Sequence, residues 1–115
     1  MAVTEFDSIS AVTMGAAEIS ILSGTTSLTP STTAGAFQLI VDAANMAKGD
    51  EYRVRIYEKC LSGGTQRVLA QWTMLGAQSE LLVTPTFMLL NGWDMTIIKI
   101  AGTDRAFTAS VRKAG

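Results

Sequence analysis

Period-two alternation of apolar and polar side chains is the feature that most constrains this chain, and it is clearest in residues 51–75, EYRVRIYEKCLSGGTQRVLAQWTML. Successive side chains of a β-strand point to opposite faces, so this period predicts strands with one buried and one exposed face. A Ser/Gly-rich break between the two runs predicts an antiparallel hairpin. A single hairpin is barely stable in water, so the chain needs more strands to bury the apolar face.

Further strand signals follow along the chain. Residues 17–22 and 35–43 alternate in the same way, and residues 80–84 and 86–90 are short apolar runs separated by Pro85. Proline cannot donate a ladder hydrogen bond, so Pro85 marks a bend, an edge or a break between sheets. About seven to eight short strands, with turn signals every 8–12 residues, predict an all-β fold that is an antiparallel β-sandwich or a small barrel.

Turn lengths predict the pairing of the hairpin in residues 51–75. A three-residue turn would set Tyr52 opposite Trp72 and Tyr57 opposite Arg67, a favourable cross-strand contact. A loop two residues longer would set Lys59 opposite Arg67, and these like charges would cost stability. We therefore favour the shorter loop, although the glycines at 63–64 also permit a bulge.

A second hairpin is predicted at the end of the chain, where GTDR separates DMTIIKIA from AFTASVRK. A four-residue turn there would pair Ile100 with Phe107, Ile98 with Ala109 and Thr96 with Val111. The Asn-Gly pair at 91–92 also predicts a tight turn, because this dipeptide is the strongest short hairpin signal.

The N-terminal third has a different composition. Residues 23–35, SGTTSLTPSTTAG, are mostly Ser and Thr and contain no apolar stripe, which predicts an extended loop or arm. Residues 5–17 are the only candidate helix, and their Thr, Ser and Gly content argues against it. We expect residues 1–34 to form an N-terminal strand and extended arm or loop, and residues 35–115 to form the sandwich core of a single domain.

The composition argues against catalysis and against bound cofactors or metals. The sequence has no histidine, which is the commonest general base and metal ligand, and its single cysteine, Cys60, cannot form an internal disulfide. The acid pairs Glu5/Asp7 and Asp94/Asp104 lie near turns, where carboxylates are normally solvated. We expect a protein that is not an enzyme.

Charge and hydropathy restrict the expected cellular location and the expected classes of partner. No run approaches the ~20 apolar residues of a membrane span, and the N-terminus lacks a basic segment before an apolar one. We expect synthesis in a cytoplasm and no membrane partner. The net charge is −1, with −4 in residues 1–50 and +3 in residues 51–115. This imbalance is either scatter or electrostatic complementarity between neighbouring copies.

Five residues are candidates for a protein interface: Arg53, Arg55, Tyr57, Arg67 and Trp93. The basic face of the hairpin is not needed for folding, and it meets either water or another protein, where arginine is enriched. The slightly negative total charge and the single interleaved aromatic argue against nucleic acid. Trp93 follows Asn-Gly and either folds back over the sandwich or anchors a partner. Trp72, Met74 and Met88 fall on predicted core positions.

The segments YRVRIYEK, SGGTQR, NGWDMT and AGTDRAF resemble small β-rich virion proteins that are encoded beside the capsid genes of tailed bacteriophages. The resemblance covers roughly the C-terminal two thirds of the chain and implies a non-enzymatic capsid decoration or cement protein. Its partners would then be the major capsid protein and further copies of itself, as a homo-oligomer on the capsid exterior. The N-terminal arm could lie along a neighbour.

Two alternative functions remain open from the sequence. The first is a head–tail, neck or tail structural component. The second is a carbohydrate- or receptor-binding β-sandwich in which Trp93 and Tyr57 act as stacking platforms.

Overall fold

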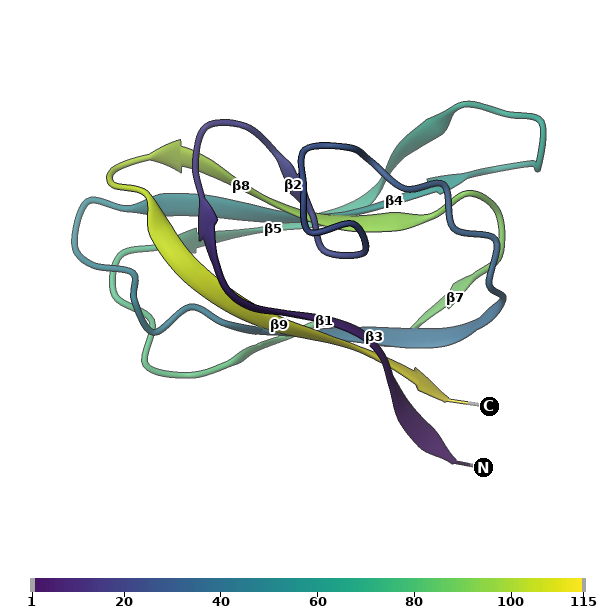
Figure 1. Cartoon of the computed structure of the whole chain (residues 1–115), viewed down its shortest axis with the longest axis horizontal. Helices are drawn as coiled ribbons and strands as arrows, with labels where there is room; N and C mark the ends of the chain where they lie inside the picture. The colour runs from purple at the N-terminus through teal and green to yellow at the C-terminus, as the bar shows by residue number, and fades with distance from the viewer. Residues whose placement is uncertain (1, 115) are drawn as a thin grey trace.

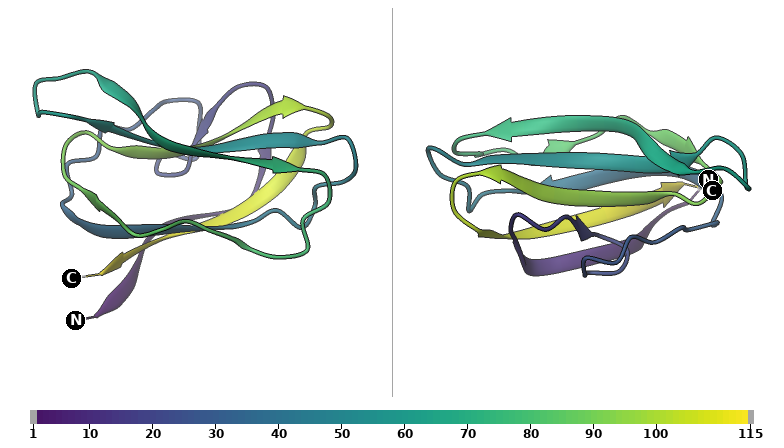
Figure 2. Two further views of the ribbon diagram at one scale, coloured as in Figure 1. Left: turned by 180° about the vertical axis from the view of Figure 1, so that it is seen from behind. Right: turned by 90° about the horizontal axis from the view of Figure 1, so that it is seen from above.

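Antiparallel strands build two sheets that pack face to face in the computed structural model, which describes residues 2–114 (Figures 1 and 2). Within these residues the strands are β1 (Val3–Met14), β2 (Ile19–Ser20), β3 (Gly35–Asp42), β4 (Glu51–Lys59), β5 (Gln66–Leu75), β6 (Leu82–Val83), β7 (Phe87–Leu89), β8 (Asp94–Ala101) and β9 (Arg105–Ala114). The first sheet has the order β1-β9-β3-β6, with β7 also paired to β3, and the second has the order β2-β8-β4-β5. The predicted all-β sandwich is confirmed, with nine strands in the described residues instead of seven or eight.

The inward faces of three strands are the ones that the alternation predicts. Each of the following side chains is buried: Phe37, Leu39 and Val41 of β3, Tyr52, Val54 and Ile56 of β4, and Phe107, Ala109 and Val111 of β9. These strands lie inside their sheets, where every alternate side chain meets the opposite layer. Burial of each large apolar side chain stabilises the fold by about 1.5–3 kcal/mol.

The N-terminal segment is part of the sandwich, and its described residues, from 2 onwards, form no helix. Strand β1 pairs with β9 along the first sheet, and its Ile9 and Met14 are buried in the core. Sandwich structure thus begins at Val3, whereas we expected it from residue 35. Only Ile19–Ser20 of residues 17–22 form a strand. The register of β1 shifts twice, and Ala11 at one shift has a positive φ of 52°.

The predicted C-terminal hairpin is wrong, because β8 and β9 lie in different sheets. Strand β8 pairs with β2 and β4, whereas β9 pairs with β1 and β3. The pairings predicted for Ile100, Ile98 and Thr96 therefore do not form, and residues 102–104 cross from one sheet to the other as an arch. The Asn-Gly turn at 91–92 likewise carries the chain between sheets, from β7 to β8.

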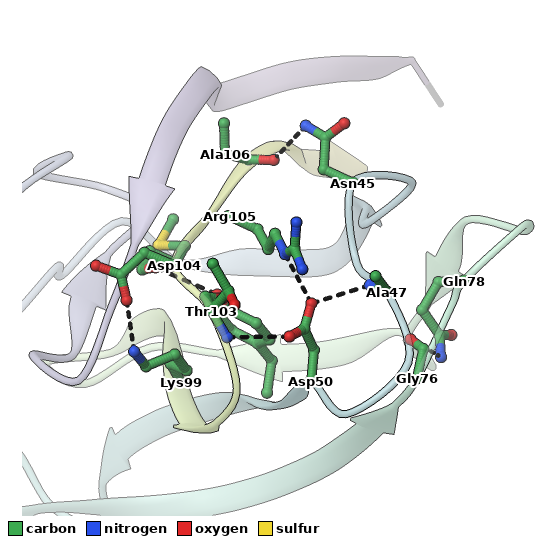
Figure 3. Close-up of polar contacts among 12 residues, drawn as sticks. Asn45, Ala47, Asp50, Gly76, Gln78, Lys99, Thr103, Asp104, Arg105 and Ala106 are labelled. Atoms are coloured by element: carbon green, nitrogen blue, oxygen red, sulfur yellow. Dashed lines mark hydrogen bonds and ion pairs between the residues drawn. The ribbon is translucent and has the colours of Figure 1, made fainter.

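A buried carboxylate explains why the GTDR segment arches instead of closing a hairpin (Figure 3). Asp50 accepts hydrogen bonds from the Thr103 N–H (3.0 Å), the Ala47 N–H (2.9 Å) and Arg105 Nε (2.8 Å). Gly102 has a φ of +95°, and a Cβ at that position would collide with the Asp50 carboxylate. The arch is thus held by a residue that is distant in sequence and lies in the turn that precedes β4.

The β4–β5 hairpin has a register two residues away from the predicted one as far as Ile56, and one residue away from Tyr57 onwards. Tyr52 pairs with Met74 and Val54 with Trp72, and a bulge after Ile56 leaves Leu69 of β5 unpaired. Beyond the bulge Glu58 lies opposite Arg67. Neither predicted loop is therefore formed: the loop is longer than three residues, and the bulge sets Lys59 opposite Gln66 instead of Arg67.

Trp93 is the centre of the core at the other end of the sandwich. Its side chain has 0% exposure, and its ring centroid lies 4.4 Å from that of Phe37 and 5.7 Å from that of Phe6. Its indole N–H donates to the Thr33 carbonyl at 2.8 Å, and its backbone bridges to Ser31. Trp93 therefore folds back, and the loop before β3 closes over it.

Because Trp93 fills this end of the core, we expect Trp93→Ala to lower the free energy of unfolding by about 3–5 kcal/mol. The control is Trp72→Ala, since Trp72 is half-buried on the edge strand β5 and should cost less. Urea denaturation followed by circular dichroism measures both. Equal losses for the two variants would contradict the central role of Trp93.

The Asp50 arch also predicts a pH dependence. Backbone N–H groups of Thr103 and Ala47, followed by Arg105, lower the pKa of Asp50 from 3.8 to about 2. The stabilisation by this carboxylate is present above pH 4 and is lost as the pH falls from about 4 towards 2. The gap in urea midpoint between wild type and Asp50→Asn should therefore be widest above pH 4 and should narrow towards pH 2. A gap that is constant from pH 2 to 6 would refute this assignment.

Candidate protein-binding groove

The predicted basic face of β4 is partly used within the chain. Glu18 accepts hydrogen bonds from the Tyr57 hydroxyl at 2.7 Å and from Thr96 Oγ1 at 2.5 Å, and its carboxylate lies 3.4 Å from Arg55 Nη1. Burial, and then the Glu18 carboxylate, raise the pKa of Tyr57, so this hydroxyl stays a donor at neutral pH. The idea that this face is not needed for folding is therefore wrong for Arg55 and Tyr57, which fasten residues near Glu18 to the second sheet.

The other predicted interface residues have three different environments. Arg53 is near the surface, with Glu51 at 3.9 Å. Arg67 is exposed on β5, and its side chain makes no ion pair or hydrogen bond with any of residues 2–114. Trp93 is fully buried, so it cannot anchor a partner or serve as a stacking platform.

Part of the charge imbalance is neutralised inside one molecule. Glu18 pairs with Arg55, and Asp50 pairs with Arg105, so acids of the N-terminal half meet bases of the C-terminal half. The predicted arm also stays on its own molecule, because the Thr29 N–H donates to Asp94 at 2.7 Å and residue 31 bridges to Trp93. Residues 23–33 are a loop, as predicted, but one that packs on the sandwich.

The structure does not bring the acid pair Asp94 and Asp104 together. Asp94 is fully buried and accepts hydrogen bonds from Ser20 Oγ and from the N–H groups of Thr29 and Met95. Burial raises the pKa of Asp94, but no solvent or substrate reaches it. Asp104 forms an ion pair with Lys99 at 2.5 Å, at the opposite end of β8. Within residues 2–114 there is no group of three or more His, Cys, Asp or Glu that could hold a metal ion.

A groove lies between the far end of the β4–β5 hairpin and β7. It encloses about 940 Å³. Its walls carry four apolar side chains that are between 45% and 87% exposed: Val68, Leu69, Met88 and Leu90. Such a concentration of exposed apolar side chains on two facing walls is typical of an interaction site.

The prediction that Met88 lies in the core is wrong, although Met74 is buried as predicted. Leu89 takes the inward position of the short strand β7, so the period of two turns Met88 outwards. The period of two also predicts Val68 on the same face as Trp72 and Met74, but Val68 is exposed because the bulge at Leu69 breaks the alternation beyond Ala70. The sequence signal that points to the groove is a pair of apolar runs, VLA at 68–70 and MLL at 88–90. One small core cannot bury every side chain of both runs.

Glu58 closes one end of the groove. Its carboxylate accepts hydrogen bonds from the N–H groups of Leu90 at 2.6 Å and Asn91 at 3.0 Å. The stem of Lys59 packs over Gly92, whose φ is +51° and where a Cβ would lie 2.8 Å from Lys59 Cδ. The hairpin is therefore fixed to the chain that follows β7, and the groove is a built part of the fold.

The two walls are also strand edges. β5 is the outermost strand of the second sheet, and β7 pairs only with β3, so each has a free side within the described part of the chain. The remaining edges are less open, since β1 has two register shifts and β2 and β6 are two residues long, whereas β5 has a single bulge, at Leu69. Bulges and short lengths are devices by which edge strands avoid pairing.

The comparisons with known proteins concern the fold. No protein-family model and no curated protein sequence matches this chain. A solved structure of Bacillus endospore appendages, described as disulfide-linked pili, is 13% identical with a TM-score of 0.52, over 97% of this chain and 88% of that chain. The Yersinia pseudotuberculosis-derived mitogen is 7% identical with a TM-score of 0.53, over 98% of this chain and 86% of that chain.

A xylan-binding domain from carbohydrate-binding module family 22 is 12% identical, with a TM-score of 0.43 over 84% of this chain and 64% of that chain. The similarities to the endospore appendage and to the mitogen, at identities this low, show a shared fold alone. Residues 2–114 also contain no helix of the length and apolar character that a bilayer crossing needs.

Because Tyr57 donates to a half-buried carboxylate, we expect Tyr57→Phe to lower the free energy of unfolding by about 1–2 kcal/mol. The matched control is Arg53→Gln, whose exposed ion pair should be worth less than about 1 kcal/mol. Chemical denaturation at pH 7 measures both. An unchanged stability of Tyr57→Phe would argue that Tyr57 is free for a partner.

Proposed function

We propose that this protein is a non-enzymatic structural subunit of a larger protein assembly and that it docks onto its partner through the groove between β5 and β7. The observation that carries the proposal is the exposed apolar lining of this groove between two free strand edges. Each fully buried Val, Leu or Met side chain contributes about 1.5–3 kcal/mol, so covering the four partly exposed ones would supply several kcal/mol towards binding.

The more specific proposal is a capsid decoration protein on the head of a tailed bacteriophage, bound to the major capsid protein on the capsid exterior. Its support is the resemblance described above, together with where the resembling segments lie. YRVRIYEK, SGGTQR and NGWDMT supply Glu58, Lys59, Gly64, Arg67 and Asn91 to the groove lining. A head–tail, neck or tail component would use the same groove with another partner.

A carbohydrate-binding function has no support from the residues that suggested it. Trp93 is buried, and Tyr57 is hydrogen-bonded to Glu18. Neither ring is therefore placed as an open stacking platform.

Co-sedimentation tests the proposal with purified heads, made without this protein, of a tailed phage that encodes it. Wild-type protein should pellet with the heads, and the double variant Leu69→Lys/Met88→Lys should bind at least about tenfold more weakly, because two charges would have to be buried. The control is Leu81→Lys, an exposed leucine that does not line the groove. No pelleting of folded wild-type protein would overturn the decoration role, and equal binding by the double variant would overturn the docking role of the groove.

A further inference from the structure

We propose that the groove accepts an extended segment of the partner protein as an added β-strand along β5, with apolar side chains in the groove and a carboxylate against Arg67. The inference rests on the proposed docking role of the groove. It goes further by stating the backbone conformation and the chemistry of the segment that binds.

The backbone of β5 favours strand addition. This ten-residue strand pairs on one side with β4, and among residues 2–114 no strand pairs with its other side. Its segment from Ala70 to Leu75 keeps one register throughout, and the bulge at Leu69 turns the remainder of the strand at the groove. An unpaired row of backbone N–H and C=O groups is a template for another strand, and main-chain hydrogen bonds of this kind supply affinity in many peptide complexes.

The side chains on the walls set the apolar part of the ligand. Val68 and Leu69 belong to one wall, and Met88 and Leu90 belong to the other. An extended chain points alternate side chains to one face, so a segment with apolar residues at every second position would place them between these walls. Met88, with 87% exposure and three rotatable bonds, can adapt to different side chains.

The charges at the groove specify the polar part of the ligand. Arg67 lies directly opposite Glu58 in the β4–β5 ladder, yet no ion pair joins them. Glu58 is occupied by the N–H groups at the end of β7, so the positive charge of Arg67 is left for a partner. Arginine binds carboxylates through two parallel hydrogen bonds, which makes an acidic residue its best match.

The same charges argue against a second copy of this chain as the occupant. Arg67 is the only charged residue of β5, so two copies of β5 would bring together no carboxylate for either arginine. Strand β1 carries Glu5 and Asp7, but Glu5 accepts a hydrogen bond from Ser110 and the strand is irregular at two points. The partner is therefore a different, acidic and apolar, extended segment.

The test uses the peptide Thr-Val-Thr-Val-Asp-Val-Thr-amide, with fluorescein on its N-terminal amine, and fluorescence anisotropy with the full-length protein. A second peptide has Lys in place of Asp, and a third keeps every side chain of the first but has alternate backbone nitrogens methylated. The Asp peptide should bind wild-type protein at least about tenfold more tightly than the other two. Arg67→Glu should reverse the preference between the Asp and Lys peptides, which loss of folding could not do.

Several results would overturn the inference. These are no binding of the Asp peptide at about 1 mM, equal binding of the Asp and Lys peptides, or full binding of the methylated peptide. Sedimentation velocity that shows a wild-type dimer, broken by Leu69→Lys, would identify a second copy as the occupant instead. If heads bind through the groove while the methylated peptide binds fully, strand addition fails and the docking role stands. If the Asp peptide binds as expected while the groove variant still binds heads, the docking role in the assembly fails.

Discussion

The architecture depends on one carboxylate that holds two sheets together through the backbone. Asp50 sits at the entrance to β4 and receives hydrogen bonds from the arch between β8 and β9, and the Tyr52 hydroxyl adds a bond to the Thr103 carbonyl at 2.7 Å (Figure 3). Without this anchor the GTDR segment would be free to close a local hairpin. Because the arch sends β9 into the first sheet, β1 and β3 each gain their longest pairing partner. A carboxylate 53 residues away in sequence thus holds the arch that separates β8 from β9.

Trp93 lies at the other connection between the two sheets, the one from β7 to β8, as Asp50 does at the arch from β8 to β9. The chain passes from β7 to β8 through Asn91 and Gly92, and the indole that follows fills the core beneath the loop of residues 23–33. Glu58 and Lys59 reach the same crossing from the hairpin, so the groove and the core meet at these residues. The packing that buries Trp93 therefore also sets the position of the β7 wall relative to β5.

The sequence predicts the parts of this structure that depend on local periodicity. The inward faces of β3, β4 and β9 follow directly from the period of two, and so do the sandwich class and the loop at residues 23–33. The sheet assignment of β8, the burial of Trp93 and the bulge at Leu69 do not follow, because each is set by residues distant in sequence. A turn sequence such as GTDR is compatible with both a hairpin and an arch. Of the candidate interface residues, the structure leaves Arg53 and Arg67 at the surface and engages Arg55 and Tyr57 with Glu18.

The bulge at Leu69 divides the β4–β5 hairpin into two regions that are under different packing constraints. On one side of it Tyr52, Val54 and Ile56 are packed in the core, and their partners in β5 are constrained with them. On the other side Arg67 and Val68 are exposed, and neither belongs to the core. Mutations that change what the groove recognises can therefore accumulate with little change in the free energy of unfolding. A family of proteins with this fold could diversify its attachments through a few residues at the end of one hairpin.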